Sequence, residues 1–189
     1  MWGKRFWKIW LVLLSALILC LYLAERADHI GRRQRLQRIF DAAVTAAAEF
    51  SVPLPLILAV IEVESDFRPE VISVAGAHGL MQLMPETFAF LRDERLHEQL
   101  PDEAILAPAT NIRYGACYLS YLQEKFQDRS TTLAAYNAGE RRVSEWLKDP
   151  ALSASGVTLD RIPFPETENY VKKVLVAFEF YDKNIHDIY

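Results

Sequence analysis

Residues that build most metal, disulfide and nucleotide sites are scarce in this sequence. It has two cysteines, Cys20 in an apolar run and Cys117 in a predicted helix, so no intramolecular disulfide is expected. A glycine-rich phosphate loop is missing, because Gly76 and Gly79 fit neither nucleotide-binding spacing. Metal-ligand spacing is also missing among the four histidines, which are His29, His78, His97 and His186. We therefore expect neither a metal site nor a cofactor.

Acidic residues are missing from the N-terminal segment and abundant after it. Residues 1–24 contain three basic side chains and no acidic one, and residues 25–38 contain five arginines against two acids. Residues 39–189 carry 13 basic and 23 acidic side chains, which gives a net charge of −10. About 150 residues suffice for one domain with its own core. The negative charge argues against a nucleic-acid partner, which requires clustered cations.

The N-terminal segment has the composition of a membrane anchor. No residue is charged from Ile9 to Ala24, and with the residues just before it the segment approaches the roughly 20 residues that cross a bilayer. A cleavable signal peptide is the alternative, although no convincing small-x-small cleavage site follows. We predict an anchor or signal sequence over residues 1–24 and a basic juxtamembrane linker or helix over residues 25–38. Basic residues flank the apolar run on both sides, so charge alone leaves its orientation open.

Helical periodicity dominates the rest of the chain, and no segment shows the sustained alternation of a strand. The first predicted helix covers residues 30–50, and Ser51 is a candidate cap for a second helix that ends near Glu64. Further helices are predicted at 85–92, 111–127, 131–137, 140–148 and 166–183. Loops are predicted at 66–80, 93–110 and 149–165. We therefore expect one mainly α-helical domain over residues 39–189.

Glu64 is the leading candidate for acid–base catalysis. It stands at the C-terminal end of an almost entirely apolar helix, where the helix dipole and desolvation both disfavour the carboxylate. A carboxyl that stays protonated near neutral pH can act as a general acid on a glycosidic oxygen. The alternative is an ordinary solvated glutamate at a helix end. Its neighbours are poor partners, since Glu62 lies on another helix face and Asp66 falls in the following turn.

The segment from Ser73 to Pro85 is a loop of small residues that leads into a helix. Its glycines would let the backbone approach a bulky ligand closely. From the residues alone, Ser73 and Gln82 are also compatible with surface or capping roles, and Met81 with packing in the core.

Four sequence blocks, taken together, resemble the signature of the soluble lytic transglycosylases, lysozyme-like enzymes that cut bacterial peptidoglycan. The blocks run from Glu64 to Thr87, Asn111 to Leu119, Ala135 to Gly139 and Ile162 to Val171. They occur in the family's order and at family-like spacing within residues 39–182. Two departures are Ala107, where the family usually has an aspartate, and Glu168, where a basic residue is common. The resemblance implies a goose-type lysozyme-like helical domain, here behind one N-terminal transmembrane helix.

The resemblance also implies a mechanism with one carboxyl group. Glu64 would protonate the oxygen of the β-1,4 bond between N-acetylmuramic acid and N-acetylglucosamine, while the muramic N-acetyl group stabilises the cation. Glu64 would then act as base as the 6-hydroxyl of the same sugar attacks, which leaves a 1,6-anhydromuramic acid end. Ordinary glycosidases instead use two carboxylates.

By the same resemblance, the substrate-binding residues are Ser73, Met81, Gln82, Tyr136, Asn137 and Tyr170. Ser73 would bond the saccharide near the reacting centre, and Gln82 would contact the N-acetyl or muramoyl group. Tyr136 and Asn137 would line the cleft. Tyr170 would orient Glu64 or the transition state, although its helical spacing also fits a core residue.

Two other functions stay open at this point. A hydrolytic muramidase of the lysozyme type is the nearest alternative enzyme, and a cell-wall-binding scaffold of a secretion or pilus apparatus belongs to another class. The expected partners are peptidoglycan strands and the inner membrane, with envelope-spanning secretion or pilus components as further family-level partners. Because peptidoglycan lies outside the inner membrane, we expect a single-pass inner-membrane protein with a periplasmic catalytic domain. Cleavage of the signal would instead give a secreted or periplasmic protein.

Overall fold

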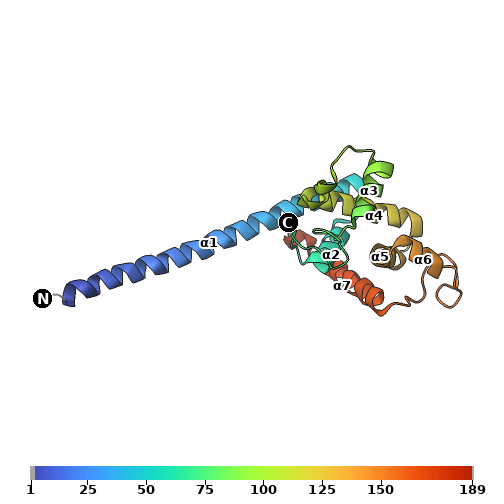
Figure 1. Cartoon of the computed structure of the whole chain (residues 1–189). Coiled ribbons are helices and arrows are strands. Elements are labelled where there is room, and N and C mark those ends of the chain that lie inside the picture. The colour runs from blue at the N-terminus through green and yellow to red at the C-terminus, as the bar shows by residue number, and fades with distance from the viewer. Residues whose placement is uncertain (1–2, 189) are drawn as a thin grey trace. The chain divides into compact units, whose positions relative to one another are not determined.

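The computed structural model describes residues 3–188, without the side chains of residues 4–6, 8–12, 15–16, 28 and 187–188. The chain divides into two compact units, Met1–Arg38 and Ile39–Tyr189. In chain order the helices are α1 (Gly3–Phe50), α2 (Leu54–Ser65), α3 (Pro85–Phe90), the π-helix η1 (Leu91–Leu96), the 3₁₀-helix η2 (Asp102–Leu106), α4 (Pro108–Phe126), α5 (Arg129–Ala138), α6 (Glu140–Trp146) and α7 (Pro165–Ile188) (Figure 1). In this described range β-structure is limited to isolated bridges, so the predicted mainly α-helical fold is confirmed.

The first unit consists of the N-terminal part of α1. The helix predicted over residues 30–50 is confirmed, and it continues without a break from the segment before it. Across the residues that the structure describes, no helix combines the length and apolarity that a bilayer crossing needs. Most side chains of residues 1–12, where the predicted anchor begins, lie outside the described residues. The anchor therefore stays a prediction.

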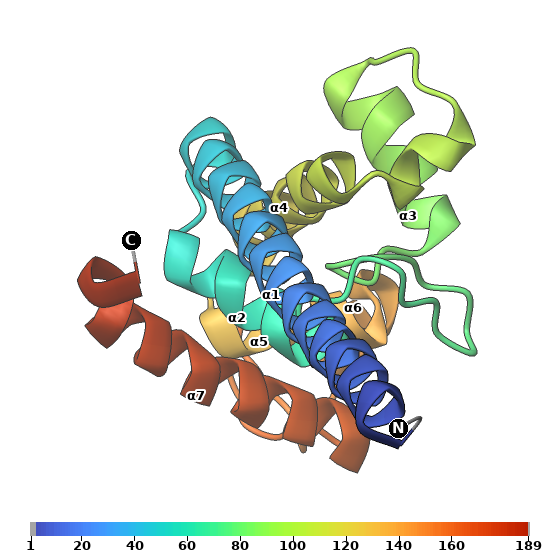
Figure 2. The same cartoon turned by 90° about the vertical axis from the view of Figure 1, so that its left-hand side faces the viewer.

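The second unit is built around α2. Six consecutive residues, from Leu56 to Ile61, are at most 2% exposed. A helix that is apolar on all sides needs neighbours on all sides, and α7 supplies the most extensive of them by running along it (Figure 2). α5 packs against α4, α6 and α7, so its buried face joins the same core. This arrangement brings the C-terminal end of α2, the C-terminal end of α5 and the first half of α7 into one region.

The prediction that Ser51 caps the second helix is wrong. Ser51 has a left-handed backbone with φ of 55°, and the next amide, of Val52, donates to the Ala47 carbonyl at 3.2 Å. These features terminate α1, because a left-handed residue closes the last turn of a helix. Pro53 takes the N-cap position of α2 without a side-chain cap, and Leu54 starts the helix.

The predicted loop at 93–110 is also partly wrong. The chain continues from α3 into η1 and then forms η2 before α4 begins. Arg92 connects these turns, since its guanidinium donates to the Leu100 carbonyl at 3.0 Å and to Asp102 at 2.6 Å. The short helices depend on contacts between turns, which local periodicity does not record.

Candidate active site

Glu64 is the last residue but one of α2, and its backbone position is fixed from two sides. Asp66 adopts the left-handed C-cap conformation, and its amide donates to the Glu62 carbonyl at 2.9 Å. Ser65 is buried, and its hydroxyl lies 3.0 Å from the Ile61 carbonyl and 2.8 Å from the Leu80 carbonyl. The second contact fastens the end of α2 to the loop that follows it.

Burial raises the pKa of Glu64 from 4.5 to about 7. The Tyr170 hydroxyl opposes part of this rise, because it favours the charged carboxylate. No charged side chain contributes to the shift. Near neutral pH the carboxyl is thus present in both protonation states, as a group that donates and later accepts a proton requires.

Two tyrosines lie beside Glu64. Burial and then the Glu64 charge raise the pKa of both Tyr136 and Tyr170. The Tyr136 hydroxyl donates to the Met81 carbonyl at 2.8 Å, whereas the Tyr170 hydroxyl has no partner of ordinary hydrogen-bond length within the described residues. The Tyr170 hydroxyl therefore interacts with the Glu64 carboxyl from beyond ordinary hydrogen-bond length. Tyr170 is 7% exposed, so it is a core residue, as its helical spacing predicted. Its predicted role in orienting Glu64 stays a prediction.

Glu62, two residues before Glu64, has a partner of its own. It accepts a hydrogen bond of 2.6 Å from the Tyr181 hydroxyl on α7. This confirms that Glu62 and Glu64 point in different directions from α2.

Gln82 is held in an unusual conformation at the end of the loop. Its backbone has φ of 46°, and its side-chain Nε2 donates to the carbonyls of Gly79 at 2.9 Å and Val71 at 3.1 Å. Both amide hydrogens are thereby used. The remaining polar atom, Oε1, has no partner within the described residues and can accept a hydrogen bond.

Asn111 is the residue that fixes the loop, and the sequence indicated it only as the start of the second motif block. It is 1% exposed, and its Oδ1 accepts from the Met81 amide at 2.8 Å. Its Nδ2 donates to the carbonyls of His78 at 2.8 Å and Ile105 at 3.1 Å. A Cβ at Gly79 would lie 2.6 Å from Nδ2, so this position has room only for glycine. The two motif blocks therefore meet at this pair.

Ala107 stands where the family usually has an aspartate. It is the N-cap of α4, and no side-chain hydrogen bond caps this helix. The helix starts on Pro108 instead, which lacks an amide hydrogen that would need a partner.

Met81 and Ser73 lie differently from the other predicted ligand contacts. The Met81 side chain is fully buried against Gly115, and the described structure leaves it no surface toward a ligand. Ser73 is half-buried, and its Oγ accepts from the Ala77 amide at 3.0 Å. In this structure the Met81 carbonyl positions Tyr136, and the Ser73 hydroxyl shapes its own loop.

A cavity of about 210 Å³ brings three of the predicted residues together. We call it the cleft cavity. Its lining residues are Gln82, Leu83, Met84, Thr87, Tyr118, Tyr136, Asn137, Ala138 and Gly139. The rings of Tyr118 and Tyr136 lie 5.3 Å apart. Aromatic rings with uncharged amides suit a sugar, which offers apolar faces, hydroxyls and amides.

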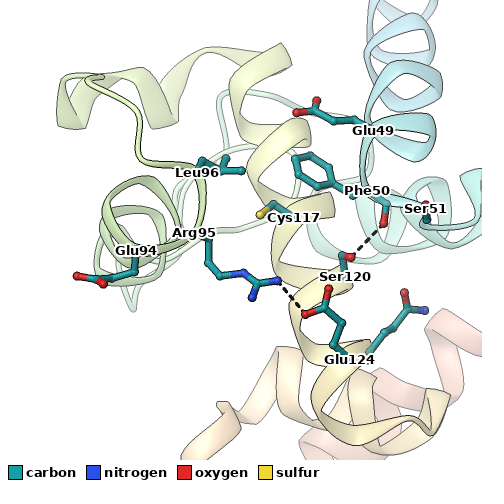
Figure 3. A pocket seen from close by; sticks show the side chains of 10 residues that line it. Glu49, Phe50, Ser51, Glu94, Arg95, Leu96, Cys117, Ser120 and Glu124 are labelled. Atoms are coloured by element: carbon teal, nitrogen blue, oxygen red, sulfur yellow. Dashed lines mark hydrogen bonds and ion pairs between the residues drawn. The ribbon is translucent and has the colours of Figure 1, made fainter.

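A larger cavity, of about 660 Å³, contains none of the predicted site residues (Figure 3). It is formed by the end of α1, by η1 and by α4. Arg95 and Glu124 pair across it at 2.9 Å, and the Ser120 hydroxyl donates to the Phe50 carbonyl at 3.0 Å. Another of its carboxylates, that of Glu49, pairs with Arg113 at 2.6 Å. Within the described residues no cluster of histidine, cysteine or acidic side chains has the geometry of a metal site.

Comparison with known proteins gives a consistent result. The family described as transglycosylase SLT domain matches residues 41–154. The soluble lytic murein transglycosylase of Escherichia coli K12 is 38% identical over 133 residues, covering 69% of this chain and 21% of that protein. The membrane-bound lytic murein transglycosylase C of Histophilus somni is 34% identical over 123 residues, covering 60% of this chain and 33% of that protein.

A solved structure agrees with these relatives. An inactive glutamate-to-glutamine mutant of the lytic transglycosylase Slt from Pseudomonas aeruginosa superposes with a TM-score of 0.67 and 32% identity, over 77% of this chain and 24% of that one. The chain spans about a fifth to a third of the length of the relatives named here.

Proposed function

Because this chain belongs to the transglycosylase SLT domain family, as its sequence motifs predicted, we propose that it is a peptidoglycan lytic transglycosylase. It cleaves the β-1,4 bond between N-acetylmuramic acid and N-acetylglucosamine and leaves 1,6-anhydromuramic acid ends. One observation carries the proposal. Glu64 is a half-buried carboxyl whose pKa is raised to about 7, and its neighbour Tyr136 lines an uncharged cavity of about 210 Å³.

The first step is protonation of the glycosidic oxygen by Glu64. The bond to the muramic anomeric carbon then breaks, and the N-acetylglucosamine part leaves as an alcohol with the proton from Glu64. Positive charge develops on the anomeric carbon, and the N-acetyl group of the muramic acid stabilises it. The Tyr170 hydroxyl, close to Glu64 and without another partner in the described structure, stabilises the carboxylate that this step creates.

The second step regenerates Glu64. The carboxylate removes the proton from the muramic 6-hydroxyl, whose oxygen bonds to the anomeric carbon. No water is consumed, so the two products together have the composition of the substrate. A single carboxyl group can serve both steps because the same proton position is emptied and refilled.

Five further residues complete the proposed site. Gln82 accepts a hydrogen bond from the substrate N-acetyl or muramoyl group through Oε1, and Asn137 and Tyr136 line the cleft. Ser73 contacts the saccharide from its loop, near the reacting centre. Met81 acts through its backbone, which holds Tyr136. A structural relative that was solved as an inactive glutamate-to-glutamine mutant supports the dependence of this chemistry on one glutamate.

The mass of the released products tests the reaction. The full chain is incubated with purified peptidoglycan, and soluble muropeptides are analysed by mass spectrometry. We expect anhydro-muropeptides, which are one water lighter than the reducing forms and resist borohydride reduction. Reducing ends would contradict the proposal and identify a hydrolytic muramidase.

A substitution of Glu64 distinguishes an enzyme from a wall-binding scaffold. Glu64→Gln should lower the rate of release about 10³-fold, the typical contribution of general acid–base catalysis. Glu62→Gln is the matched control, since it removes the same charge two residues away and should keep activity. A protein that binds peptidoglycan but releases nothing, with or without Glu64, would instead be a scaffold.

We further propose that residues 1–24 anchor the protein in the inner membrane and that the catalytic domain lies in the periplasm. The uncharged run from Ile9 to Ala24 and the location of peptidoglycan support this placement. One group of relatives is named membrane-bound lytic murein transglycosylase C, which is consistent with an envelope location.

A further inference from the structure

A cavity on α6 adjoins the cleft cavity. Its volume is about 400 Å³, and we call it the arginine cavity. The lining residues are Ala138, Gly139, Arg141, Arg142, Glu145 and Trp146. Ala138 and Gly139 line both cavities, so the two share one wall.

The shared wall is bare backbone at Gly139. This residue has φ of 91°, a conformation that favours glycine, and a Cβ built on it would meet no atom within 4 Å. Packing therefore does not explain the glycine by itself. Gly139 therefore places no side chain on the wall that the two cavities share.

The two arginines of this cavity lack the ion pairs that other arginines of the domain form. Arg92 and Arg113, for example, lie within 2.9 Å of carboxylates. Arg141 and Arg142 form no ion pair within the described residues, although Arg141 is close enough to lower the pKa of Glu145. Glu145 itself pairs with Lys148 at 2.8 Å. Two adjacent guanidinium groups thus remain available in a domain whose net charge is negative.

Aromatic contacts hold one of these arginines in place. The Arg142 guanidinium lies 5.4 Å from the centre of the Phe164 ring, which in turn contacts Trp146 at 5.2 Å in an edge-on arrangement. Stacking of this kind orients the planar donor group and leaves its edge free for a carboxylate. The cavity therefore combines an apolar wall with positioned cationic donors.

We propose that the arginine cavity binds the peptide stem of the muramic acid residue, with Arg141 and Arg142 contacting its carboxylates. This inference rests on the proposed function. Peptide stems of peptidoglycan carry free carboxylates, which match guanidinium donors, and alanine methyl groups, which match the Trp146 wall. A glycan in the cleft cavity would extend its stem over Gly139. The arginines would then favour strands that keep their peptides.

Binding measurements on the full chain test this site. Isothermal titration calorimetry compares an N-acetylglucosamine–N-acetylmuramic acid disaccharide that carries its stem with the same disaccharide after an amidase has removed the stem. We expect Arg141→Gln/Arg142→Gln to bind the stem-bearing ligand about tenfold more weakly, the effect of one lost charge-assisted hydrogen bond. Its Kd for the stripped ligand should not change. The difference should shrink as salt screens the charges.

Two further variants serve as controls. Lys173→Gln/Lys183→Gln also removes two positive charges, from exposed positions on α7 that line neither cavity, and should leave both affinities unchanged. Arg141→Lys/Arg142→Lys should recover part of the lost affinity, because it keeps the charge and loses the bidentate geometry. Thermal unfolding establishes that each variant is folded.

The outcomes separate this inference from the proposed function. Equal Kd values of the wild type and Arg141→Gln/Arg142→Gln for the stem-bearing ligand would overturn the inference. Equal weakening for both ligands would also overturn it, because the arginines would then contact the sugar. A wild type that prefers the stem-bearing ligand but leaves peptidoglycan uncut would refute the proposed function and support the stem site.

Discussion

Glu64 has a raised pKa because of where α2 ends. Residues Leu56 to Ile61 of this helix are buried, and the turn that follows them carries the Glu64 carboxyl into a region where desolvation is the largest influence on its pKa. Tyr170 provides the opposing interaction from α7. The pKa of such a carboxyl is set by its burial and by one neutral hydrogen-bond donor, and both depend on how the helices pack.

The raised pKa predicts a pH-dependent effect on stability. The pKa of Glu64 is about 7 in the folded chain and 4.5 ordinarily, so the folded state loses stability relative to the unfolded chain as pH rises between these values. Glu64→Gln removes this loss. We expect it to raise the free energy of unfolding at pH 8 by up to about 3 kcal/mol, less where solvent reaches the carboxyl, and to have little effect at pH 4. Urea unfolding at both pH values measures this; an equal change at both would contradict it.

Tyr170 is expected to set the pH at which activity declines. Protonated Glu64 is the acid, so activity falls as pH rises through the pKa of Glu64. The hydroxyl of Tyr170 lowers that pKa, and Tyr170→Phe should therefore move the falling limb of the kcat/KM profile to higher pH. Tyr181→Phe removes a hydroxyl that bonds Glu62 instead, and should leave the limb in place. A uniform loss of rate without a shift of the limb would assign Tyr170 a packing role only.

At the level of elements, the loop between α2 and α3 is held by α4. Asn111 binds three backbone groups, and two of these belong to the loop, which carries Gln82 and ends at α3. Ser65 supplies a second attachment, from α2. The catalytic end of α2 and the substrate-binding loop are thereby fixed to each other and to the core.

This attachment predicts a strong effect of Asn111→Ala. The change removes three hydrogen bonds and takes the side-chain partner from the Met81 amide and the Ile105 carbonyl, whereas the His78 carbonyl still accepts from the Leu83 amide at 3.0 Å. We expect it to lower the free energy of unfolding by about 3 kcal/mol. Hydrogen exchange of residues 71–83 should accelerate as well. Asn137→Ala, at an exposed position, should leave stability nearly unchanged.

A double-mutant cycle with Gly79→Ala tests the contact itself. The new Cβ collides with Asn111, so part of its destabilising effect should disappear in the Asn111→Ala background, with a coupling energy of about 1 kcal/mol or more. The strain of a left-handed backbone at φ of 77° remains in both backgrounds. Additive effects would show that the two residues do not restrain each other.

At the scale of the whole molecule, charge and apolarity are separated along the chain. The acidic residues are concentrated in residues 39–189, and the basic residues of 25–38 follow the apolar run. An arginine-rich segment next to a bilayer is attracted to anionic head groups. The proposed anchor would in this way hold the catalytic unit close to the membrane surface.

Removal of residues 1–24 tests the anchor. We expect the full chain to stay in the membrane fraction after a carbonate wash and the shortened chain, 25–189, to be released. The shortened chain should keep its activity on purified peptidoglycan, because Glu64 and the cleft cavity belong to the second unit. A full chain that is washed from membranes as readily as the shortened one would contradict the anchor.

Local sequence patterns predicted the helices well and the irregular turns poorly. Helices α4, α5, α6 and α7 begin and end within a few residues of their predictions, because their apolar spacing is local information. The turns η1 and η2 depend on Arg92, whose partners lie in the following turns. The prediction for Ser51 was wrong because similar residue types occur at the position that caps the start of a helix and at the position that ends one.

The sequence by itself determined that the chain is helical, which family it belongs to and that Glu64 is the candidate acid, because periodicity and motif spacing are local properties. The tertiary structure decided which polar atoms are available. The Gln82 amide hydrogens and the Ser73 hydroxyl form hydrogen bonds within the loop, and the Met81 side chain is buried. Arg141 and Arg142, which line the arginine cavity, form no ion pair in the described structure. Such differences arise from contacts between segments that are distant in the chain, and only folding brings those segments together.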